Sequence, residues 1–406
     1  MSQLRKAVIV DYARSAFSRS RPREPEKDVF NSLRMDATAG MIIKEILKRT
    51  KVDPKDINDV LVGTAMPVAE QWTYGGRTVV FQADLPVTVP AEQTDRQCAS
   101  TICTIHKAAM EIMLGYSDVV ISAGIEHMTH IPMGMMPDDP RNILRQPDPR
   151  FVTDESFKKY DFMTAMNMGL TAEKLFAESG LTREAMDKWA LRSHQLAAKA
   201  LAEGYFKGEI IPIEVTMADG TKQVIDHDMA IRGDTTMEGL AALKPAFRPD
   251  GQITAGNSSP LNAGATVTML MSEEKAKEYK LKPLATVVSM GWAAVEPNVM
   301  GKGPVPASRM ALKHAGMDVK DIDFWEINEA FCIVALWAIQ QLGIDPEKVN
   351  VKGGATAIGH PLGASGNRLT GTLARILNME GGTYGIANAC IGGGQGAAVL
   401  IKKEKY

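Results

Sequence analysis

Apolar positions follow two patterns along the chain. They recur at helical spacing in 37–49 and 101–114, and Ser100 stands where a helix N-cap belongs. Short, nearly continuous apolar runs at 59–63 and 118–123 are typical of strands that are buried on both faces. The first part of the chain is therefore predicted to alternate between strands and helices.

The chain also contains an internal repeat. The segment VDPKDINDVLVGTA (52–65) resembles MDVKDIDFWEINEA (317–330), and the matches share an offset of 265 residues (318 − 53). The same offset aligns Ala99-Ser100 with Ala364-Ser365. Helix, strand, helix and strand are then expected to recur at 307–314, 324–327, 367–378 and 384–389. The repeat predicts an α/β protein with parallel sheets, built from two halves related by a pseudo-twofold axis.

A long insertion separates the two repeats, at about 124–251. It begins with a proline-rich, charged stretch, 136–150, that is typical of a surface loop. Helices are expected at 172–178 and 183–203, the second capped by Thr182. The insertion is the natural place for substrate selectivity. We expect an N-terminal half at 1–274, insertion included, and a C-terminal half at 275–406.

Composition and charge exclude several classes of protein. The net charge of −2 gives no electrostatic basis for binding nucleic acid or an anionic membrane surface. No apolar run reaches the roughly 18 residues of a membrane helix. The N-terminus enters a strand-like run at 7–10 without a signal-peptide pattern, so a cytoplasmic location is expected.

Cysteines supply the first candidate chemistry. Cys98, Cys103, Cys332 and Cys390 are expected to be free thiols, and their spacing predicts no zinc or other metal site. Cys98 directly precedes a predicted helix, where the helix dipole favours the thiolate. Most free cysteines are small buried hydrophobes, however, and Cys98 by itself allows both interpretations.

Three further segments carry candidate chemistry. His360 is the one titratable residue in the small-residue loop 353–366, which suits acid–base work better than a lone histidine elsewhere. Cys390 precedes the glycine turn at Gly392, whose backbone amides could serve as oxyanion donors, although the turn could equally be structural. Asn328, after a strand, could be a helix cap or could hold a catalytic water. The repeat would bring Cys98, Cys390 and His360 to the interface between the halves, as covalent catalysis requires.

These four motifs, in this order, resemble the thiolase family, and the resemblance covers about 4–402. It implies the layered α-β-α-β-α thiolase fold with an inserted loop domain. It also implies that Cys98 is the acylated nucleophile and that His360 activates it and binds the thioester oxygen. Asn328 would hold a water beside His360, and Cys390 would protonate the leaving enolate. The amides of Cys98 and Gly392 would form a second oxyanion hole.

The resemblance extends to substrate binding. Met168 matches the lining of the acyl pocket, while Arg232, Phe247 and Ser259 match contacts of coenzyme A. Coenzyme A would be a co-substrate, and no permanently bound cofactor is implied. The segments around Glu126–Thr129 and Asn167 favour a degradative 3-ketoacyl-CoA thiolase of fatty-acid β-oxidation. Gly239 and Ala263 depart from the usual family residues.

Three alternatives stay open from the sequence. One is a biosynthetic acetyl-CoA acetyltransferase that makes acetoacetyl-CoA. Another is a ketosynthase acting on carrier-protein thioesters, which Asn328 and Cys390 disfavour because ketosynthases pair the cysteine with two histidines. The third is a non-catalytic acyl-CoA- or lipid-binding protein, which the presence of Cys98, His360 and Cys390 disfavours. By analogy with the family, a homodimer or homotetramer is expected.

Overall fold

The computed structural model describes residues 4–131 and 148–404. The elements of the first half, before the insertion, are β1 (Ala7–Arg14), α1 (Met35–Thr50), β2 (Asp59–Gly63), α2 (Arg77–Gln82), β3 (Ala91–Thr94), α3 (Ser100–Leu114) and β4 (Val119–His127). After the insertion, this half closes with β7 (Ala263–Ser272) and α9 (Glu273–Glu278). The second half contains β8 (Ala285–Ala294), α10 (Pro304–Ala315), β9 (Phe324–Ile327), α11 (Cys332–Leu342), α12 (Ala355–Ile358), α13 (Ser365–Glu380), β10 (Tyr384–Ile391) and β11 (Gln395–Lys402).

The strand order displays the repeat directly. Nine strands run in the order β3-β2-β4-β7-β1-β8-β11-β10-β9. Counting outward from the central β1–β8 pair, β1, β7, β4 and β2 correspond to β8, β11, β10 and β9, and β3 is an additional edge strand. The two sets pair alike, because β2 and β4 are parallel, as are β9 and β10, while the remaining pairs are antiparallel. The two halves meet where β1 pairs with β8.

The expectation of parallel sheets was therefore only partly right. Strands β7 and β11 return antiparallel beside β4 and β10, so each half of the sheet is mixed. In the second half, the turn Gly392–Gly394 reverses the chain, with Gly393 and Gly394 both at positive φ. A reversal this short can only join antiparallel neighbours, whereas parallel strands need a longer crossover.

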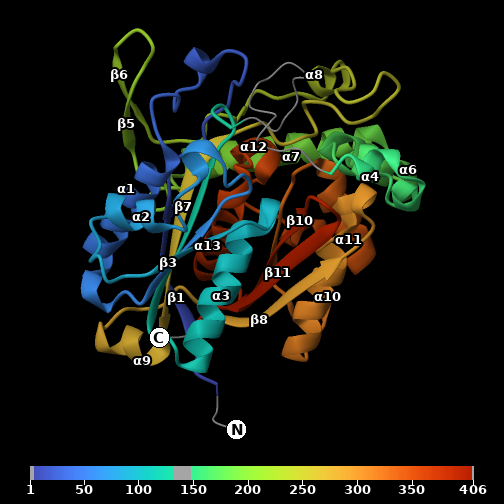
Figure 1. Cartoon of the computed structure of the whole chain (residues 1–406). Helices are drawn as coiled ribbons and strands as arrows, with labels where there is room; N and C mark the ends of the chain where they lie inside the picture. The colour runs from blue at the N-terminus through green and yellow to red at the C-terminus, as the bar shows by residue number, and fades with distance from the viewer. Residues whose placement is uncertain (1–3, 132–147, 405–406) are drawn as a thin grey trace.

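Helices and sheet halves form alternating layers. In Figure 1, α3 and α13 lie between the two halves of the sheet, with α1 and α2 outside the first half and α10 and α11 outside the second. The central helices approach closely, since a Cβ added at Gly366 would lie 2.2 Å from the backbone nitrogen of Ile102. This is the predicted α-β-α-β-α arrangement, and the α/β class is confirmed. No helix in the described part of the chain is long and apolar enough to cross a membrane.

The predicted offset holds in three dimensions. Moving α3 (100–114) by 265 residues gives 365–379, which coincides with α13 (Ser365–Glu380). The 3₁₀ turns before these helices, Gln97–Ala99 and Leu362–Ala364, are related in the same way. Cys98 and Gly363 therefore occupy equivalent turns.

Ser100 does not cap α3 as expected. It already has helical φ and ψ angles and forms the first residue of the helix. Its hydroxyl donates to the carbonyl of Gln97 at 2.7 Å and accepts from the Arg96 amide at 3.0 Å. The preceding 3₁₀ turn explains the difference, because it winds the chain before the α-helix begins.

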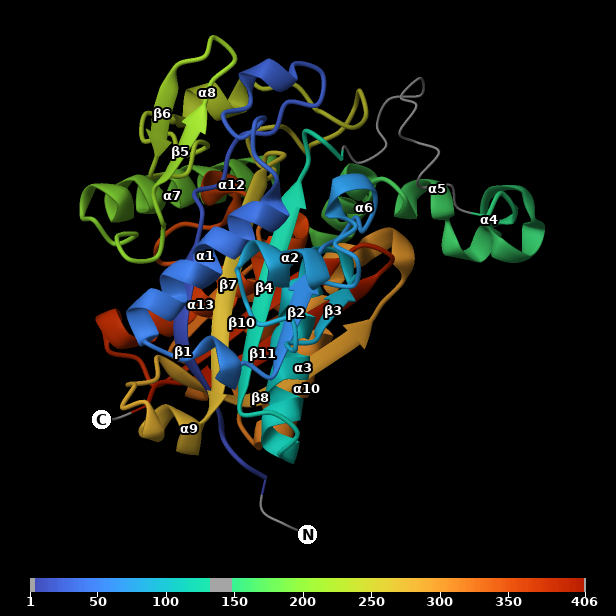
Figure 2. The same cartoon turned by 60° about the vertical axis from the view of Figure 1, so that its left-hand side comes forward.

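The segment between β4 and β7 forms a separate cover. Figure 2 shows it gathered at the end of the sheet toward which β4 points, with both chain termini at the opposite end. Thr182 caps the long helix of this cover as predicted, accepting from the amide of Ala185 at 3.1 Å. The predicted surface loop at 136–150 lies almost entirely outside the described residues. The elements of the cover are α4 (Arg150–Thr153), α5 (Phe162–Ala165), α6 (Met168–Ser179), α7 (Arg183–Ala202), β5 (Ile213–Thr216), β6 (Lys222–Ile225) and α8 (Met237–Ala241).

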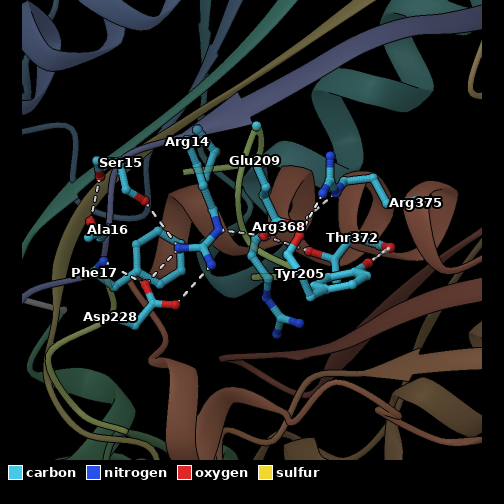
Figure 3. A network of polar contacts seen from close by, with 12 residues as sticks. Arg14, Ser15, Ala16, Phe17, Tyr205, Glu209, Asp228, Arg368, Thr372 and Arg375 are labelled. Atoms are coloured by element: carbon cyan, nitrogen blue, oxygen red, sulfur yellow. Dashed lines mark hydrogen bonds and ion pairs between the residues drawn. The ribbon is translucent and has the colours of Figure 1, made fainter. Parts of the chain in front are cut away.

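A buried ionic network ties this cover to the sheet (Figure 3). Arg14, at the end of β1, donates to both carboxylate oxygens of Asp228 at 2.6 and 2.9 Å and to Glu209 at 2.7 Å. All three side chains are fully buried. Arg375 on α13 lies 3.4 Å from the second oxygen of Glu209. The network therefore joins β1, the inserted segment and the central helix layer.

Candidate active site

One cavity of about 870 Å³ lies between the cover and the ends of the central helices. Cys98 and His360 both line it. All four residues predicted to bind substrate also line it: Met168, Arg232, Phe247 and Ser259. Asn328, Cys390 and Gly392 are not part of the cavity wall but contact residues that are, as described below. The structure thus brings together every residue that the sequence pointed to.

Cys98 sits in the 3₁₀ turn that leads into α3, and the turn has an unusual backbone. Gln97 adopts a left-handed conformation, with φ +47°, which costs a residue other than glycine about 1–3 kcal/mol. Two bonds hold it there: its amide donates to the Asp95 carboxylate at 2.8 Å, and its side chain donates to the Ala65 carbonyl at 3.3 Å. The turn leaves the Cys98 side chain only 6% exposed, at the floor of the cavity.

The electrostatics of Cys98 differ from the expected ones. Burial raises the pKa of its thiol to about 12, and the nearby Glu126 carboxylate raises it further. The backbone N–H groups of Gly392 and of Cys98 itself donate to the sulfur and lower the pKa, but by less than burial raises it. The predicted effect of the helix start is thus outweighed by desolvation. Cys98 rests as a thiol and needs a base to form the thiolate.

Cys390 lies beside Cys98 at the end of β10. It is fully buried, and both burial and the charge of Cys98 hold its pKa well above the usual range. Cys390 therefore keeps its proton at rest. Two thiols thus meet at the ends of β10 and of the turn before α3, which is the convergence predicted from the repeat.

His360 is held in a defined tautomer. Its Nδ1 lies 2.5 Å from the Ser365 hydroxyl, and that hydroxyl donates to the Pro361 carbonyl at 2.9 Å. Because the hydroxyl proton is already used, Ser365 accepts a hydrogen bond from Nδ1–H. The lone pair of the ring is therefore on Nε2, where it accepts from the Asn328 side-chain amide at 3.2 Å. Burial and the charge of Arg368 lower the pKa of His360 to about 3, so the ring is neutral.

Asn328 contacts the other nitrogen of this imidazole. Its side-chain Nδ2 lies 3.2 Å from Nε2 of His360. Its Oδ1 is buried and has no hydrogen-bond partner among the described residues. Asn328 is not the cap of α11, which begins only at Cys332 with Phe331 in the capping position. Of the two roles left open by the sequence, the structure rules out the cap.

Glu329 positions the loop that carries His360, a role that the sequence did not reveal. Its buried carboxylate accepts from Trp189 at 2.9 Å, Ser193 at 2.8 Å, Asn350 at 2.7 Å and the Thr356 amide at 3.1 Å. Two of these donors belong to α7, Asn350 precedes α12, and Thr356 lies within α12. The carboxylate thereby joins the cover to the His360 loop.

Glu126 plays a similar role on the other side of the site. Its carboxylate accepts from the backbone amides of Ala65 and Gly363, both at 2.9 Å, and from Gln71 at 2.6 Å. Burial raises the pKa of Glu126 to about 7. Ala65 belongs to the first half of the chain and Gly363 to the second. Glu126 therefore joins the two halves next to Cys98.

The wall of the cavity also contains an arginine-rich segment that our sequence analysis missed. Arg19, Ser20, Arg21 and Arg23 line the cavity together with Arg232. The signal was present, since three arginines occur within five residues in RSRPR. The overall charge of −2 concealed this local excess.

Close packing shapes the side of the cavity that α6 forms. A Cβ added at Gly169 would lie 2.0–2.3 Å from the ring of Phe247, so only glycine lets this ring lie against α6. Phe247 in turn packs edge-on against Phe331 at 5.8 Å between ring centroids. The aromatic wall therefore depends on the missing side chain of Gly169.

Comparison with known proteins agrees with this site. The family model for the thiolase N-terminal domain matches residues 7–274, and that for the thiolase C-terminal domain matches 281–403. A 3-ketoacyl-CoA thiolase of Marinobacter nauticus is 40% identical over 404 residues, 98% of each chain. Two solved structures match over the full length of both chains, each with a TM-score of 0.86. They are acetyl-CoA acetyltransferase of Bacillus anthracis, at 36% identity, and human mitochondrial 3-ketoacyl-CoA thiolase, at 34%.

The chain belongs to the thiolase family. It is an acyltransferase, and the predicted thiolase function and fold are confirmed.

Proposed function

We propose that the chain cleaves 3-ketoacyl-CoA with coenzyme A, giving acetyl-CoA and an acyl-CoA two carbons shorter. The observation that carries this proposal is the meeting of three groups in suitable protonation states. Cys98 and His360 line one cavity, and Cys390 lies beside Cys98. In this proposal the N-terminal half, 1–274, supplies Cys98, and the C-terminal half, 275–406, supplies His360 and Cys390.

In the first half-reaction, Nε2 of His360 accepts the proton of Cys98, and the sulfur attacks the 3-keto carbon of the substrate. The carbon–carbon bond then breaks and expels the enolate of acetyl-CoA, leaving the acyl group on Cys98. The fixed tautomer of His360 supports its role as base. The unpartnered Oδ1 of Asn328 supports its role in holding a water that donates to the enolate oxygen.

The expelled enolate carbon takes its proton from Cys390, whose raised pKa keeps that proton available. In the second half-reaction, the Cys390 thiolate takes the proton of the coenzyme A thiol, whose sulfur attacks the acyl-Cys98 thioester. The released Cys98 thiolate regains its proton from His360, so both cysteines and the histidine return to their starting states. The backbone amides of Cys98 and Gly392 bind the thioester oxygen in this scheme, a role that their donation to the Cys98 sulfur supports. The scheme is ping-pong, with coenzyme A as co-substrate and no permanently bound cofactor.

The test is thiolysis of 3-ketoacyl-CoA esters of several chain lengths by the wild type and by Cys98→Ala. We expect loss of the ketoacyl thioester absorbance with the wild type and none above background with the variant. Activity on long chains would support a role in β-oxidation, whereas activity on acetoacetyl-CoA alone would favour the biosynthetic subclass. A wild type that binds acyl-CoA but cleaves no chain length would contradict the proposal and support a binding protein.

We further propose that the chain forms a homodimer through β3. This strand lies at one edge of the nine-stranded sheet. Val60 and Thr64 donate to the carbonyls of Pro90 and Thr94, so the intervening Ala91 and Gln93 turn their backbone groups outward. Exposed apolar side chains lie in the loops that flank β3, namely Trp72 (58%), Tyr74 (64%) and Val87 (76%). A second copy that adds its own β3 would pair this open edge.

Light scattering coupled to size exclusion tests the dimer. We expect twice the chain mass for the wild type and a monomer–dimer mixture for Ala91→Pro, which removes one outward N–H. A monomeric wild type would overturn the proposal, and a fourfold mass would show a tetramer. We also propose that the protein is located in the cytoplasm, and cell fractionation tests this location.

A further inference from the structure

Three arginines without partners face the same cavity. Arg19, Arg21 and Arg232 all line it. Within 4–131 and 148–404, none of their guanidinium groups has a hydrogen bond or an ion pair. Burial lowers the pKa of Arg19, and the positive charges of Arg232 and Arg21 lower it further. Both of these arginines therefore lie close to Arg19. Like charges brought together in this way are costly unless an anion joins them.

The acidic groups on the cavity wall do not neutralise this cluster. Glu24 and Asp234 are the two carboxylates that line the cavity. Glu24 is paired with Lys27 on its own segment. Asp234 forms no ion pair within the described residues. The positive charge of the arginines therefore remains available to a ligand.

A buried hydroxyl between the arginines points to the same conclusion. Ser20 is 7% exposed and lines the cavity, and its Oγ has no hydrogen-bond partner among the described residues. An unpaired buried hydroxyl costs about 1–3 kcal/mol unless a ligand supplies the missing bond. An oxyanion can accept from this hydroxyl and from the guanidinium groups at the same time.

The fold holds the cluster together against its own repulsion. Arg19 and Arg21 follow β1, and Arg232 follows Asp228 in the inserted segment. The segments that carry these arginines are joined by the Arg14–Asp228 pair of Figure 3 and by the Phe17 amide, which donates to Asp228 at 2.8 Å. The Met229 amide donates back to the Phe17 carbonyl at 3.0 Å. The ion pair of Arg14 with Asp228 thus holds together the two segments that carry the unpaired arginines.

We propose that Arg19, Ser20 and Arg21 act with Arg232 to bind the phosphate groups of the coenzyme A nucleotide. This inference rests on the proposed function, which places coenzyme A in this cavity. Phosphates fit because several arginines match the several charges of the nucleotide, and because guanidinium groups bind phosphate oxygens in pairs. The other source of such oxygens is a carboxylate at the far end of the acyl chain.

Steady-state kinetics with three thiol acceptors separates these cases: coenzyme A, 3′-dephospho-coenzyme A and pantetheine. Arg19→Gln and Arg21→Gln should each raise KM for coenzyme A about tenfold with kcat within about twofold, because one charge-assisted contact is lost. With pantetheine, which has no phosphate, the variants should match the wild type. An effect that disappears with 3′-dephospho-coenzyme A assigns the arginines to the 3′-phosphate, and one that persists assigns them to the pyrophosphate.

Two matched controls exist. Ser18 has an equally buried, unpartnered hydroxyl in the same segment but does not line the cavity. Ser20→Ala should therefore raise KM for coenzyme A about threefold, while Ser18→Ala should not. Arg309→Gln controls for loss of an arginine, since Arg309 donates to the Gln341 carbonyl on the outside of the second half.

Several outcomes would overturn the inference. One is an unchanged KM for coenzyme A in Arg19→Gln and Arg21→Gln. Another is an equal rise with pantetheine, which would show a structural effect. A rise seen only with 3-ketoacyl substrates that carry a distal carboxylate would assign the arginines to the acyl chain instead. Calorimetric titration with coenzyme A measures the same contacts without turnover, so an inert wild type would defeat the proposed function and leave this test decisive.

Discussion

At the scale of single residues, the bond between Ser365 and His360 decides which imidazole nitrogen is free. Ser365 can accept from Nδ1–H only because its own proton goes to the Pro361 carbonyl. Nε2 is then the basic atom, and it faces Asn328. A histidine in the other tautomer would present a proton at this position and could not act as base.

Ser365→Ala should therefore lower kcat by about tenfold to a hundredfold, less than the roughly 10²–10⁴-fold that general acid–base catalysis contributes, because the imidazole itself remains. KM should stay within about twofold, because Ser365 does not line the cavity. Steady-state thiolysis measures both constants. Ser122→Ala is the control, since it removes an equally buried hydroxyl that bonds to Asn367 rather than to the histidine. Equal losses in the two variants would refute the positioning role.

Residues of the site differ in how far the sequence reveals them. Cys98, His360 and Cys390 stand next to glycine, alanine or proline in recognisable motifs, so their chemistry could be predicted. Ser365, Glu126 and Glu329 could not, because a buried polar residue is explained only by its partners. Glu126, for example, bonds to Gly363, which lies 237 residues further along the chain.

At the scale of elements, Arg14 on β1 is the link between the sheet and the inserted segment. Its bonds to Asp228 and Glu209 lie wholly inside the protein. Removing one partner of a buried ion pair leaves the other charge uncompensated inside the protein. This lowers stability more than replacing both partners by apolar residues would.

Asp228→Ala should accordingly lower the free energy of unfolding by about 3–5 kcal/mol. Chemical denaturation of the purified protein gives this value. Glu184→Ala serves as the reference, because the Glu184–Lys188 pair on α7 is about two-thirds exposed and its loss should not measurably change stability. A loss of less than 1 kcal/mol in Asp228→Ala would mean that Arg14 finds another partner.

Elements too were predicted unevenly. The repeat pointed to β2, β4, β9 and β10 and to the helices between them. Strands β7 and β11 were missed, although β7 is buried along its whole length. Its sequence, AGATVTMLMS, mixes glycine and threonine with apolar residues, and Thr266 donates to the distant Ala364 carbonyl. Burial of this kind depends on neighbours, not on local pattern.

At the scale of the whole molecule, the central helix layer contains a neutral histidine. His106 on α3 is fully buried and bonds through Nε2 to the Ala398 carbonyl of β11 at 3.0 Å. Burial lowers its pKa from the ordinary value of 6.5 to about 3. The unfolded chain therefore takes up this proton first, so the stabilising contribution is present above pH 6.5 and is lost as the pH falls.

Between pH 6 and pH 4, the wild type should lose about 1.4 kcal/mol more unfolding free energy per pH unit than His106→Gln. Glutamine retains a donor for the Ala398 carbonyl but takes up no proton. Denaturant titrations of both proteins at several pH values provide the comparison. Parallel stability curves would show that His106 does not account for acid sensitivity.

The equivalence of the turns Gln97–Ala99 and Leu362–Ala364 bears on the ancestry of the enzyme. In a symmetric homodimer of half-length chains, every substitution would appear twice, so both turns would carry a cysteine or neither would. Here one turn has Cys98, whereas the other has Gly363, where an added Cβ would lie only 2.4 Å from the Cα atom of Thr64. Such a division of labour became possible only once gene duplication and fusion had placed both copies in one polypeptide. Covalent linkage of the halves thus allowed one ancestral turn to become the nucleophile and the other to become its support.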